Sequence, residues 1–534
     1  AAGSIFTLPV LFLWAAEGKM NEPSMLEISA IAICGGLLGV FFMIPLRNAL
    51  IVKEHGILPY PEGAACAEVL LAGEEGGSSA ITVFTGMGIA GVFKFLVDGL
   101  KVVPGVITAK ISALKTEVST EIYPALIGVG YICGPSIASF IFAGGILGWL
   151  VFIPCIVIFG AGQTVFPGTE TIEAIYAAKG ASAIWGLYIR YIGAGAVAAG
   201  GAISLIKSFP LIIATVRDTV KGMKSRESKR KTRTNEDLDM RFILCAVVLL
   251  IITIWLLPVI PVTLLGATII VILGFFFSTV ASRMVGLVGS SNNPVSGMTI
   301  ATLLFTTLIL KVAGDTGMHG GKGAIAISSV ICIIAAVASD TSQDLKAGYL
   351  LGATPKKQQI GEIIGSVTAA LVIGGVLFLL SRAWSFGTPD LPAPQATLMK
   401  MIVEGVMGDD LPWGLVLIGA FVAIVIELLK VPVLPVAIGL YLPLELSACI
   451  MIGGLTRRYS EKKNKDTNGI LFCSGMIAGE GLVGLLLAVF AVTGISGYFD
   501  FSNRINTGTV GSVIVLILIV LSVLKSSAVS IKEK

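Results

Sequence analysis

The chain has 534 residues, of which 55% are hydrophobic and 13% are charged, with a formal net charge of +4. Its mean hydropathy of +0.93 excludes a soluble protein, because one core could not bury so much apolar surface. Apolar runs of membrane-spanning length recur, and strands of about ten residues with alternating polarity are absent. We therefore expect an all-α polytopic membrane protein with about 14–16 transmembrane helices, some of them broken or re-entrant.

Apolar segments follow one another from the first residue, beginning near 1, 26, 77, 122, 144, 183, 241, 261, 294, 323, 361, 412, 431, 468 and 509. The first of them, AAGSIFTLPVLFLWAA, looks like a shortened span and lacks the basic region of a signal peptide. We expect that further sequence precedes Ala1 in the intact protein.

The stretch IPLRNALIVKEHGILPYPEGAACAEVL (44–70) crowds charged residues among apolar ones. Glu68 lies in small, apolar surroundings, where an ionised carboxylate is costly unless it is paired or protonated. Glu68 is therefore a candidate proton-coupling residue. The alternatives are a structural partner of Arg47 or a charge at a helix end.

The loop KGMKSRESKRKTR (221–233) holds seven Lys or Arg residues and one Glu. Such a loop is typical of the cytoplasmic side, and binding of nucleic acid or anionic lipid is the alternative. We expect a first transmembrane half at 1–215, this basic loop at 216–240 and a second half at 241–534, with no nucleic-acid partner.

The stretch SSNNPVSG (290–297) places small polar residues between two apolar runs. Pro294 suits the first turn of a helix, and Asn292, Asn293 and Ser296 offer hydrogen-bonding groups near that positive end, which favours a carboxylate. The alternative is an ordinary helix cap in a loop.

Further polar side chains within apolar segments are candidates for a wet cavity. Asp340 and Gln343 follow a long apolar run, whereas Asp344 and Lys346 fit a solvated helix end. Arg190 could bind a substrate carboxylate or pair with one of the intramembrane Glu residues, which are Glu427, Glu445 and Glu480.

The segment VPVLPVAIGLYLPLELSACIMIGG (431–454) contains three prolines. Counting it as a full crossing would put the basic stretch 456–465 outside, against the charge rule. We therefore interpret it as a broken or re-entrant element.

Sequence signatures of catalysis and of cofactors are missing. The eight Cys lack CxxC spacing, there are two His, and neither HExxH nor a P-loop occurs. We expect no enzyme, no ATP-driven pump, no cofactor and no permanent metal site.

The chain also resembles itself at a long period, as duplicated transporter folds do. Four pairs of similar stretches occur in the same order, starting at 4 and 299, 58 and 352, 129 and 438, and 192 and 472. Shared apolar composition is the alternative explanation.

Five stretches together resemble the oligopeptide transporter superfamily, in its bacterial branch near the yellow-stripe-like transporters. They are GLVGSSNNPVSGMTIATLL, LPYPEGAACAEVL, SDTSQDLKAGYLLGATPKKQQIGEIIG, RYIGAGAVAAGG and LPAPQATLMKMIVEGVMGDDLPW. The resemblance implies about sixteen helices in two similar halves, two of them ahead of Ala1, and proton-coupled uptake.

We expect a proton-coupled symporter of small peptides or peptide-like solutes in a bacterial inner membrane, which could form a homo-oligomer. A transporter of metal chelates of nicotianamine type is the first alternative, and a passive channel is the weaker one. The candidate substrate-binding residues are Tyr60, Arg190, Asn292, Asn293, Ser296, Gln343 and Gln395. The candidate proton-coupling residues are Glu68, Asp340, Glu445 and Glu480.

Overall fold

The chain is almost entirely helical in a computed structural model, which describes residues 2–60, 62–64, 66–67, 70–71, 78–201, 203, 206, 232–258, 260–288, 295–388, 391–408, 412–462, 467–501 and 507–528. Within these ranges nine helices are long and apolar enough to cross a membrane, namely Met25–Lys53, Ile81–Gly99, Pro124–Phe159, Arg233–Leu256, Leu264–Gly286, Gly317–Leu350, Pro355–Ala383, Asn468–Thr493 and Gly508–Ser527. The all-α polytopic class is confirmed.

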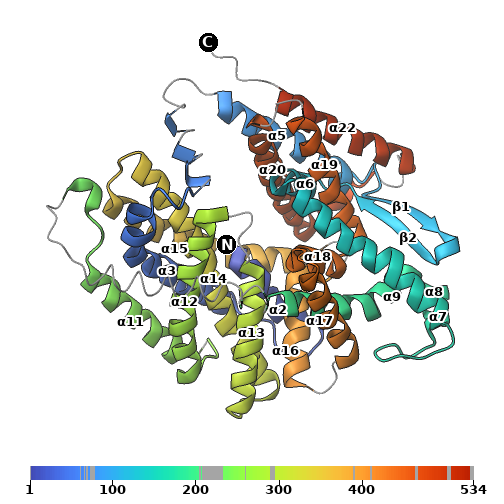
Figure 1. Ribbon diagram of the computed structural model, residues 1–534, viewed down its shortest axis with the longest axis horizontal. Helices are drawn as coiled ribbons and strands as arrows, with labels where there is room; N and C mark the ends of the chain where they lie inside the picture. Colours follow the sequence, from blue (N-terminus) through green and yellow to red (C-terminus); the bar gives the residue numbers. More distant parts are fainter. Residues whose placement is uncertain are drawn as a thin grey trace. The chain divides into compact units, whose positions relative to one another are not determined.

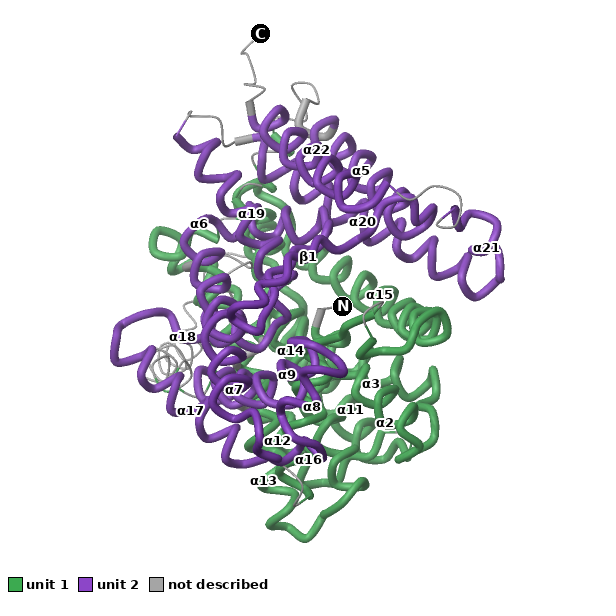
Figure 2. Tube along the Cα trace, turned by 90° about the vertical axis from the view of Figure 1, so that its right-hand side faces the viewer, with its two compact units in different colours: residues 1–72, 201–411 green, residues 73–200, 412–534 purple. Residues whose placement is uncertain are grey.

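Two compact units make up the fold (Figure 2). Unit 1 combines Ala1–Ala72 with Gly201–Leu411, and unit 2 combines Gly73–Gly200 with Pro412–Lys534. Each unit takes segments from both sides of the basic loop. The two predicted halves, 1–215 and 241–534, are thus a different division from the compact units and remain a prediction.

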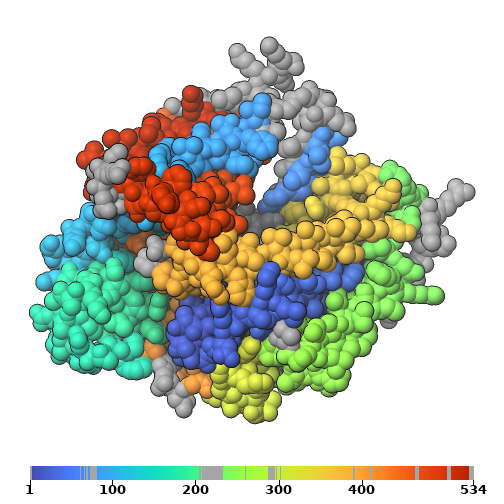
Figure 3. All heavy atoms as spheres, turned by 180° about the vertical axis from the view of Figure 1, so that it is seen from behind, coloured from blue at the N-terminus to red at the C-terminus, as the bar shows by residue number. Residues whose placement is uncertain are grey.

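Unit 1 is built around one buried helix, α14 (Gly317–Leu350), of which 89% of the most apolar window is buried. Helices α3, α12, α13, α15 and α16 contact it, and the N-terminal segment lies against the gold helices of the same unit (Figure 3). The elements of unit 1 besides α14 are α1 (Ala2–Thr7), α2 (Pro9–Ala16), α3 (Met25–Arg47), the π-helical turn η1 (Asn48–Lys53), the 3₁₀ turn η6 (Arg233–Asn235), α11 (Met240–Leu256), α12 (Leu264–Val288), α13 (Val295–Val312), α15 (Pro355–Ala383) and α16 (Pro394–Met407).

Unit 2 holds a long helix pair, a crossed pair of broken helices and a β-hairpin (Figure 1). Its elements are α5 (Ser78–Lys94), η2 (Phe95–Gly99), β1 (Val106–Ile111), η3 (Ser112–Leu114), β2 (Thr116–Glu121), α6 (Pro124–Ile146), η4 (Leu147–Phe152), α7 (Ile153–Phe159), α8 (Ile172–Lys179), α9 (Ala181–Ile184), η5 (Trp185–Ile189), α17 (Trp413–Leu428), α18 (Val433–Tyr441), α19 (Leu444–Glu461), α20 (Thr467–Thr493), α21 (Ser496–Phe499) and α22 (Gly508–Ala528). The antiparallel hairpin, with Val106 opposite Glu121, was not expected from the sequence.

The broken helices of unit 2 have matching breaks. Helix α6 is interrupted at Gly134, whose φ of 86° is left-handed, immediately before Pro135. Helices α18 and α19 are separated by the extended residues Leu442 and Pro443, so the predicted broken element is indeed broken. In the predicted repeat pair that starts at 129 and 438, the same shift of 309 residues places Gly134 opposite Pro443.

The contacts around these breaks follow the same correspondence. A Cβ added at Gly130 would overlap the carbonyl oxygen of Ile450, and one added at Gly439 would overlap that of Ile141. Since the shift relates Gly130 to Gly439 and Ile141 to Ile450, the packing is reciprocal and antiparallel, as around a local two-fold axis. This pattern supports an inverted repeat within unit 2.

The described end of the basic loop is tied to unit 1 by a buried arginine. Arg47, which is 2% exposed, donates to both carboxylate oxygens of Asp237 at 3.1 and 3.2 Å and to the carbonyl oxygen of Thr234 at 3.0 Å. Gln359 donates to the same carboxylate at 2.7 Å. The basic cluster itself, up to residue 231, lies outside the described residues.

Candidate functional site

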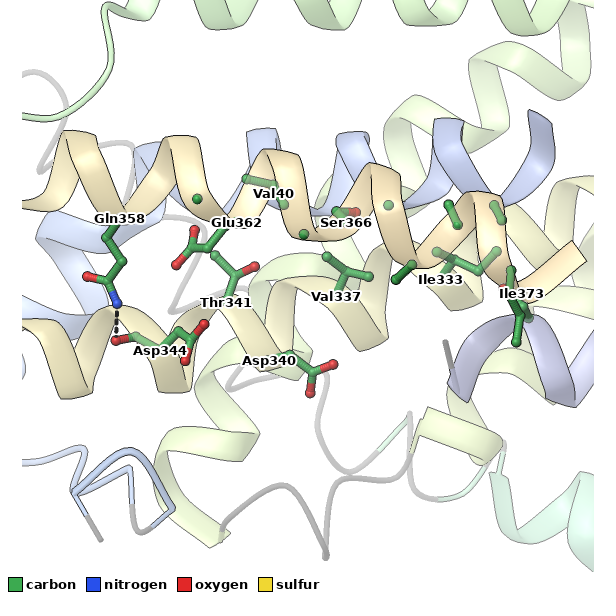
Figure 4. Close-up of a pocket in the computed structure, with 17 residues that line it drawn as sticks. Val40, Ile333, Val337, Asp340, Thr341, Asp344, Gln358, Glu362, Ser366 and Ile373 are labelled. Carbon is green, nitrogen blue, oxygen red and sulfur yellow. Dashed lines mark hydrogen bonds between the residues drawn. The ribbon is translucent and has the colours of Figure 1, made fainter. Parts of the chain in front are cut away.

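A cavity of about 520 Å³ opens in unit 1 between α3, α14 and α15 (Figure 4). Its volume lies in the range of about 300–1,000 Å³ found for small-molecule sites. It is lined by Ser4, Ala32, Gly36, Val40, Ile333, Val337, Asp340, Thr341, Asp344, Gln358, Gly361, Glu362, Gly365, Ser366, Ala369, Ala370 and Ile373.

Glycines explain why three helices meet so closely beside this cavity. On α3, the Cβ positions of Gly35 and Gly39 face side chains of α14, and that of Gly36 faces the Ser366 hydroxyl of α15. Small residues of this kind allow close approach of membrane helices. On α15, by contrast, Gly361 and Gly365 have no neighbouring atom within 4 Å of their Cβ positions, so they form an open wall.

The cavity lining is acidic. The described residues that line it include three carboxylates and no Lys, Arg or His. Figure 4 shows the Glu362 carboxylate of α15 directed towards Thr341 on α14, with Asp344 close by, whereas the Asp340 carboxylate points away from α15. Both oxygens of Glu362 are buried and make no hydrogen bond in the structure. This arrangement suits a cation or a proton.

The predicted residues Asp340 and Gln343 are both on α14, but they differ in surroundings. Asp340 is an exposed residue that lines the cavity, with its carboxylate directed away from α15 (Figure 4). Gln343 is buried, accepts a hydrogen bond from the Gly63 amide at 2.6 Å and donates to Glu62 at 2.6 Å. Gln343 therefore fixes the segment that follows Tyr60, and its role in substrate binding stays a prediction.

Tyr60 is fully buried, and its positive φ of 51° turns the chain so that its amide donates to the Gly286 carbonyl at 3.0 Å. The Lys346 ammonium lies 5.5 Å from the centre of the Tyr60 ring and donates to the Leu58 carbonyl at 2.9 Å. The prediction that Lys346 lies at a solvated helix end is therefore wrong, because this residue is 2% exposed. Tyr60 lies in a packed corner and not in the cavity.

Of the remaining substrate-binding candidates in unit 1, Gln395 is half-buried on α16, with an Oε1 atom that makes no hydrogen bond. Asn292 and Asn293 lie outside the described residues, as does the side chain of Ser296. The proton-coupling candidate Glu68 also lies outside them. Arg47, which the sequence offered as an alternative partner of Glu68, forms an ion pair with Asp237.

Arg190 belongs to unit 2, directly after the π-helical turn η5. Its guanidinium carbon lies 6.0 Å from the centre of the Trp185 ring, which stacks on Trp149 at 6.4 Å. The Nε atom of Arg190 is buried and makes no hydrogen bond. The structure shows this cation–π contact and no pairing of Arg190 with Glu445 or Glu480, whose contacts are with other residues.

A second charged cluster lies in unit 2, around the N-terminus of α6. Glu480 of α20 is 3% exposed and accepts a hydrogen bond from the Ala125 amide at 2.5 Å. The Lys94 ammonium lies 3.3 Å from the other oxygen of Glu480 and 2.5 Å from Asp98, and it stacks 4.7 Å from the centre of the Tyr123 ring. The Glu480 carboxylate therefore faces both the positive end of helix α6 and the Lys94 ammonium.

The hairpin brings a further carboxylate to this cluster. Burial raises the pKa of Glu121, at the end of β2, to about 7 against the opposing charge of Lys94, and the charges of Asp98 and Glu445 add to the rise. Glu445 accepts a hydrogen bond from Ser119 of the same strand at 2.9 Å. The two predicted residues Glu445 and Glu480 therefore belong to one extended group of charges.

Sequence reasoning missed four of these side chains. The predicted repeat that starts at 58 and 352 places Glu362 opposite Glu68, and this correspondence was the available sequence signal for Glu362. Lys94, Asp98 and Glu121 sit at ends of segments, where charges are ordinary. A lysine followed by an aspartate four residues later was the available signal for Lys94.

Comparisons with known proteins agree on one family. The sequence model of that family, described as "OPT oligopeptide transporter protein", matches residues 1–491. A Haemophilus influenzae protein named "Putative oligopeptide transporter" is 31% identical over 91% of this chain and 84% of its own length. A rice protein named "Probable metal-nicotianamine transporter YSL11" is 25% identical over 89% of this chain and 73% of its own length. A yeast protein named "Putative oligopeptide transporter YGL114W" is 26% identical over 41% of this chain and 33% of its own length.

Proposed function

This chain belongs to the oligopeptide transporter family, and we propose that it is a proton-coupled symporter that imports small peptides or peptide-like solutes. The membership makes it a multi-pass membrane transporter. The proton coupling, the direction and the peptide substrate are our proposal, and we place the protein in a bacterial inner membrane, in keeping with its bacterial relative.

The charge balance of the unit 2 cluster carries the proposal of proton coupling. The Lys94 ammonium contacts the carboxylates of Asp98 and Glu480, and it also interacts electrostatically with Glu121. The Asp98 carboxylate is exposed to solvent, so burial penalises mainly the charges of Glu480 and Glu121. One partly buried ammonium does not neutralise both of these carboxylates, and a proton on one of them balances the charge. Such a group gains or loses a proton when its surroundings change, which a symporter requires.

The hydrogen bond from Ala125 suggests how protonation would act on the fold. A protonated Glu480 would lose most of its attraction to Lys94 and to the positive end of α6. The contact between α20 and the start of α6 would weaken, while the pair of Lys94 with Asp98 would remain. Protonation is thereby linked to the packing of the broken helix α6.

The unit 1 cavity supports binding of a small polar solute. Its lining combines carboxylates, an amide and hydroxyls with apolar walls, as small-molecule sites do. Among the predicted residues Asp340 lines it. We keep Asp340 as a proton-coupling candidate, and we keep Arg190, Tyr60, Gln343, Gln395, Asn292, Asn293 and Ser296 as substrate-binding candidates whose roles await tests.

Transport of metal chelates is the second candidate function. Relatives named as metal-nicotianamine transporters favour it. Within the described part of the chain no group of three or more His, Cys, Asp or Glu could hold a metal ion. A transported metal would then be held by its chelator and recognised as part of a larger solute.

Uptake into proteoliposomes tests the proposal. We expect accumulation of labelled trialanine under an inward proton gradient, and loss of that accumulation when an uncoupler is added. Glu480→Gln should abolish the dependence on the gradient, whereas Glu173→Gln, at an exposed position of α8, should behave as the wild type. Gradient-independent uptake would contradict symport, non-saturating flux would favour a channel, and uptake of iron–nicotianamine alone would favour the second candidate.

A further inference from the structure

Glu362 is the cavity residue whose contacts are least complete. Both of its carboxylate oxygens are buried, yet neither makes a hydrogen bond. A buried carboxylate without a partner is costly, because burial removes its water and nothing replaces it. The side chain lines the cavity from α15, so a ligand bound there can supply the partner that the described residues do not provide (Figure 4).

The second carboxylate near this space is that of Asp344, one helix away on α14. No ion pair of Asp344 or Glu362 is seen in the described part of the chain, and the residues that line the cavity include no basic side chain. The Asp344 backbone carbonyl accepts a hydrogen bond from Gln358 at 2.5 Å, which ties α15 to α14 at this level. Two acidic side chains therefore face one space on helices that are fixed to each other.

The chemistry of these groups selects their ligand. Ionised carboxylates only accept hydrogen bonds, so the ligand must donate them and should carry positive charge. A metal ion is a poor fit, because the described residues offer no group of three or more His, Cys, Asp or Glu that could hold one. A primary ammonium carries one positive charge and three N–H donors, so it can donate hydrogen bonds to both carboxylates at once.

We propose that the cavity of unit 1 binds the primary ammonium group of the transported solute through the carboxylates of Glu362 and Asp344. This inference rests on the proposed function, since it names the group by which the solute is recognised. The open wall at Gly361 and Gly365 leaves room for the rest of the solute beside the two carboxylates.

Binding of labelled trialanine and of N-acetyl-trialanine to the full chain in lipid nanodiscs tests the proposal. Acetylation removes the charge and two of the donors of the amine, so it should weaken binding to the wild type by about ten-fold or more. Glu362→Gln should weaken binding of trialanine by a similar factor and leave binding of the acetylated peptide unchanged. Glu236→Gln, an exposed residue of the same unit, serves as the control.

A cavity-filling variant gives an independent result. Gly365→Leu should weaken binding of both peptides without lowering the melting temperature, because its side chain enters open space. Equal binding of the two peptides by the wild type, or an equal loss of both in Glu362→Gln, would overturn the inference while peptide uptake persists. If neither peptide binds and neither is taken up, both the inference and the proposed peptide substrate are wrong. Uptake of iron–nicotianamine then shows whether the protein is a transporter of metal chelates.

Discussion

The Lys94 ammonium lies 3.3 Å from the buried carboxylate of Glu480 and links helix α5 to helix α20. The same two helices approach closely through glycines, since a Cβ at Gly475 would overlap the carbonyl oxygen of Val83. The ion pair therefore joins two helices that are also in close backbone contact, with Glu480 buried and Lys94 partly exposed. Within unit 2 it joins the helix pair to the start of the broken helix α6.

Removing Lys94 should leave Glu480 as an uncompensated buried charge. We expect Lys94→Met to lower the stability of the protein in detergent by about 3–5 kcal/mol, the usual effect of removing one partner of a buried pair. Adding Glu480→Gln should restore much of this loss, because it removes the stranded charge. Thermal denaturation of the two single variants and the double variant measures the coupling. Additive losses would show that the two side chains do not interact.

Glu121 should make stability depend on pH near neutrality. Burial raises its pKa from 4.5 to about 7, so the folded protein favours the protonated form. The stabilisation is complete below about pH 4.5 and is lost as the pH rises through 7. At about 1.4 kcal/mol for each pKa unit, Glu121→Gln should be more stable than the wild type by about 3 kcal/mol at pH 8 and nearly equal to it at pH 4.5. A difference that does not change with pH would contradict this assignment.

The fold class was predictable because it follows from composition. Hydropathy and length identify helical spans without knowledge of their packing. The prolines at 432, 435 and 443 also predicted the broken element, and the structure separates α18 from α19 at Pro443. The sequence did not predict the hairpin 106–121, because its strands have six residues each and short polar strands have a weak sequence signal.

The site was less predictable, because partners are set by contacts between distant segments. Lys346 looked like a solvated charge after an apolar run, but the chain returns through Leu58 and Tyr60 to cover it. The sequence offered Glu68, in the same stretch, as a possible partner of Arg47. The structure pairs Arg47 with Asp237, which is 190 residues away in the chain. Local surroundings show that a charge needs a partner and do not show which one it has.

The crossing of the broken helices should not tolerate a methyl group. In Gly439→Ala the new Cβ would overlap the carbonyl oxygen of Ile141, which is backbone and cannot move aside alone. Overpacking of this kind costs about 1–3 kcal/mol or more, and we expect a lower melting temperature and reduced uptake. Gly481→Ala, on α20 with no atom within 4 Å of the new Cβ, is the control and should be neutral or slightly stabilising. Equal behaviour of the two variants would show that α6 and α18 do not cross so closely.

The Arg47–Asp237 pair should anchor the start of α11 in unit 1. Asp237→Ala removes the carboxylate that accepts hydrogen bonds from two groups, the Arg47 guanidinium and the Gln359 side-chain amide. Because Arg47 is 2% exposed, its charge would remain buried with the Thr234 carbonyl as its one partner among the described residues, and we expect a loss of about 3–5 kcal/mol. Glu236→Ala removes an exposed pair with Lys356 and should cost at most about 1 kcal/mol. Limited proteolysis between 232 and 239 should become faster in Asp237→Ala alone, and equal rates in the two variants would mean that Arg47 does not hold this segment.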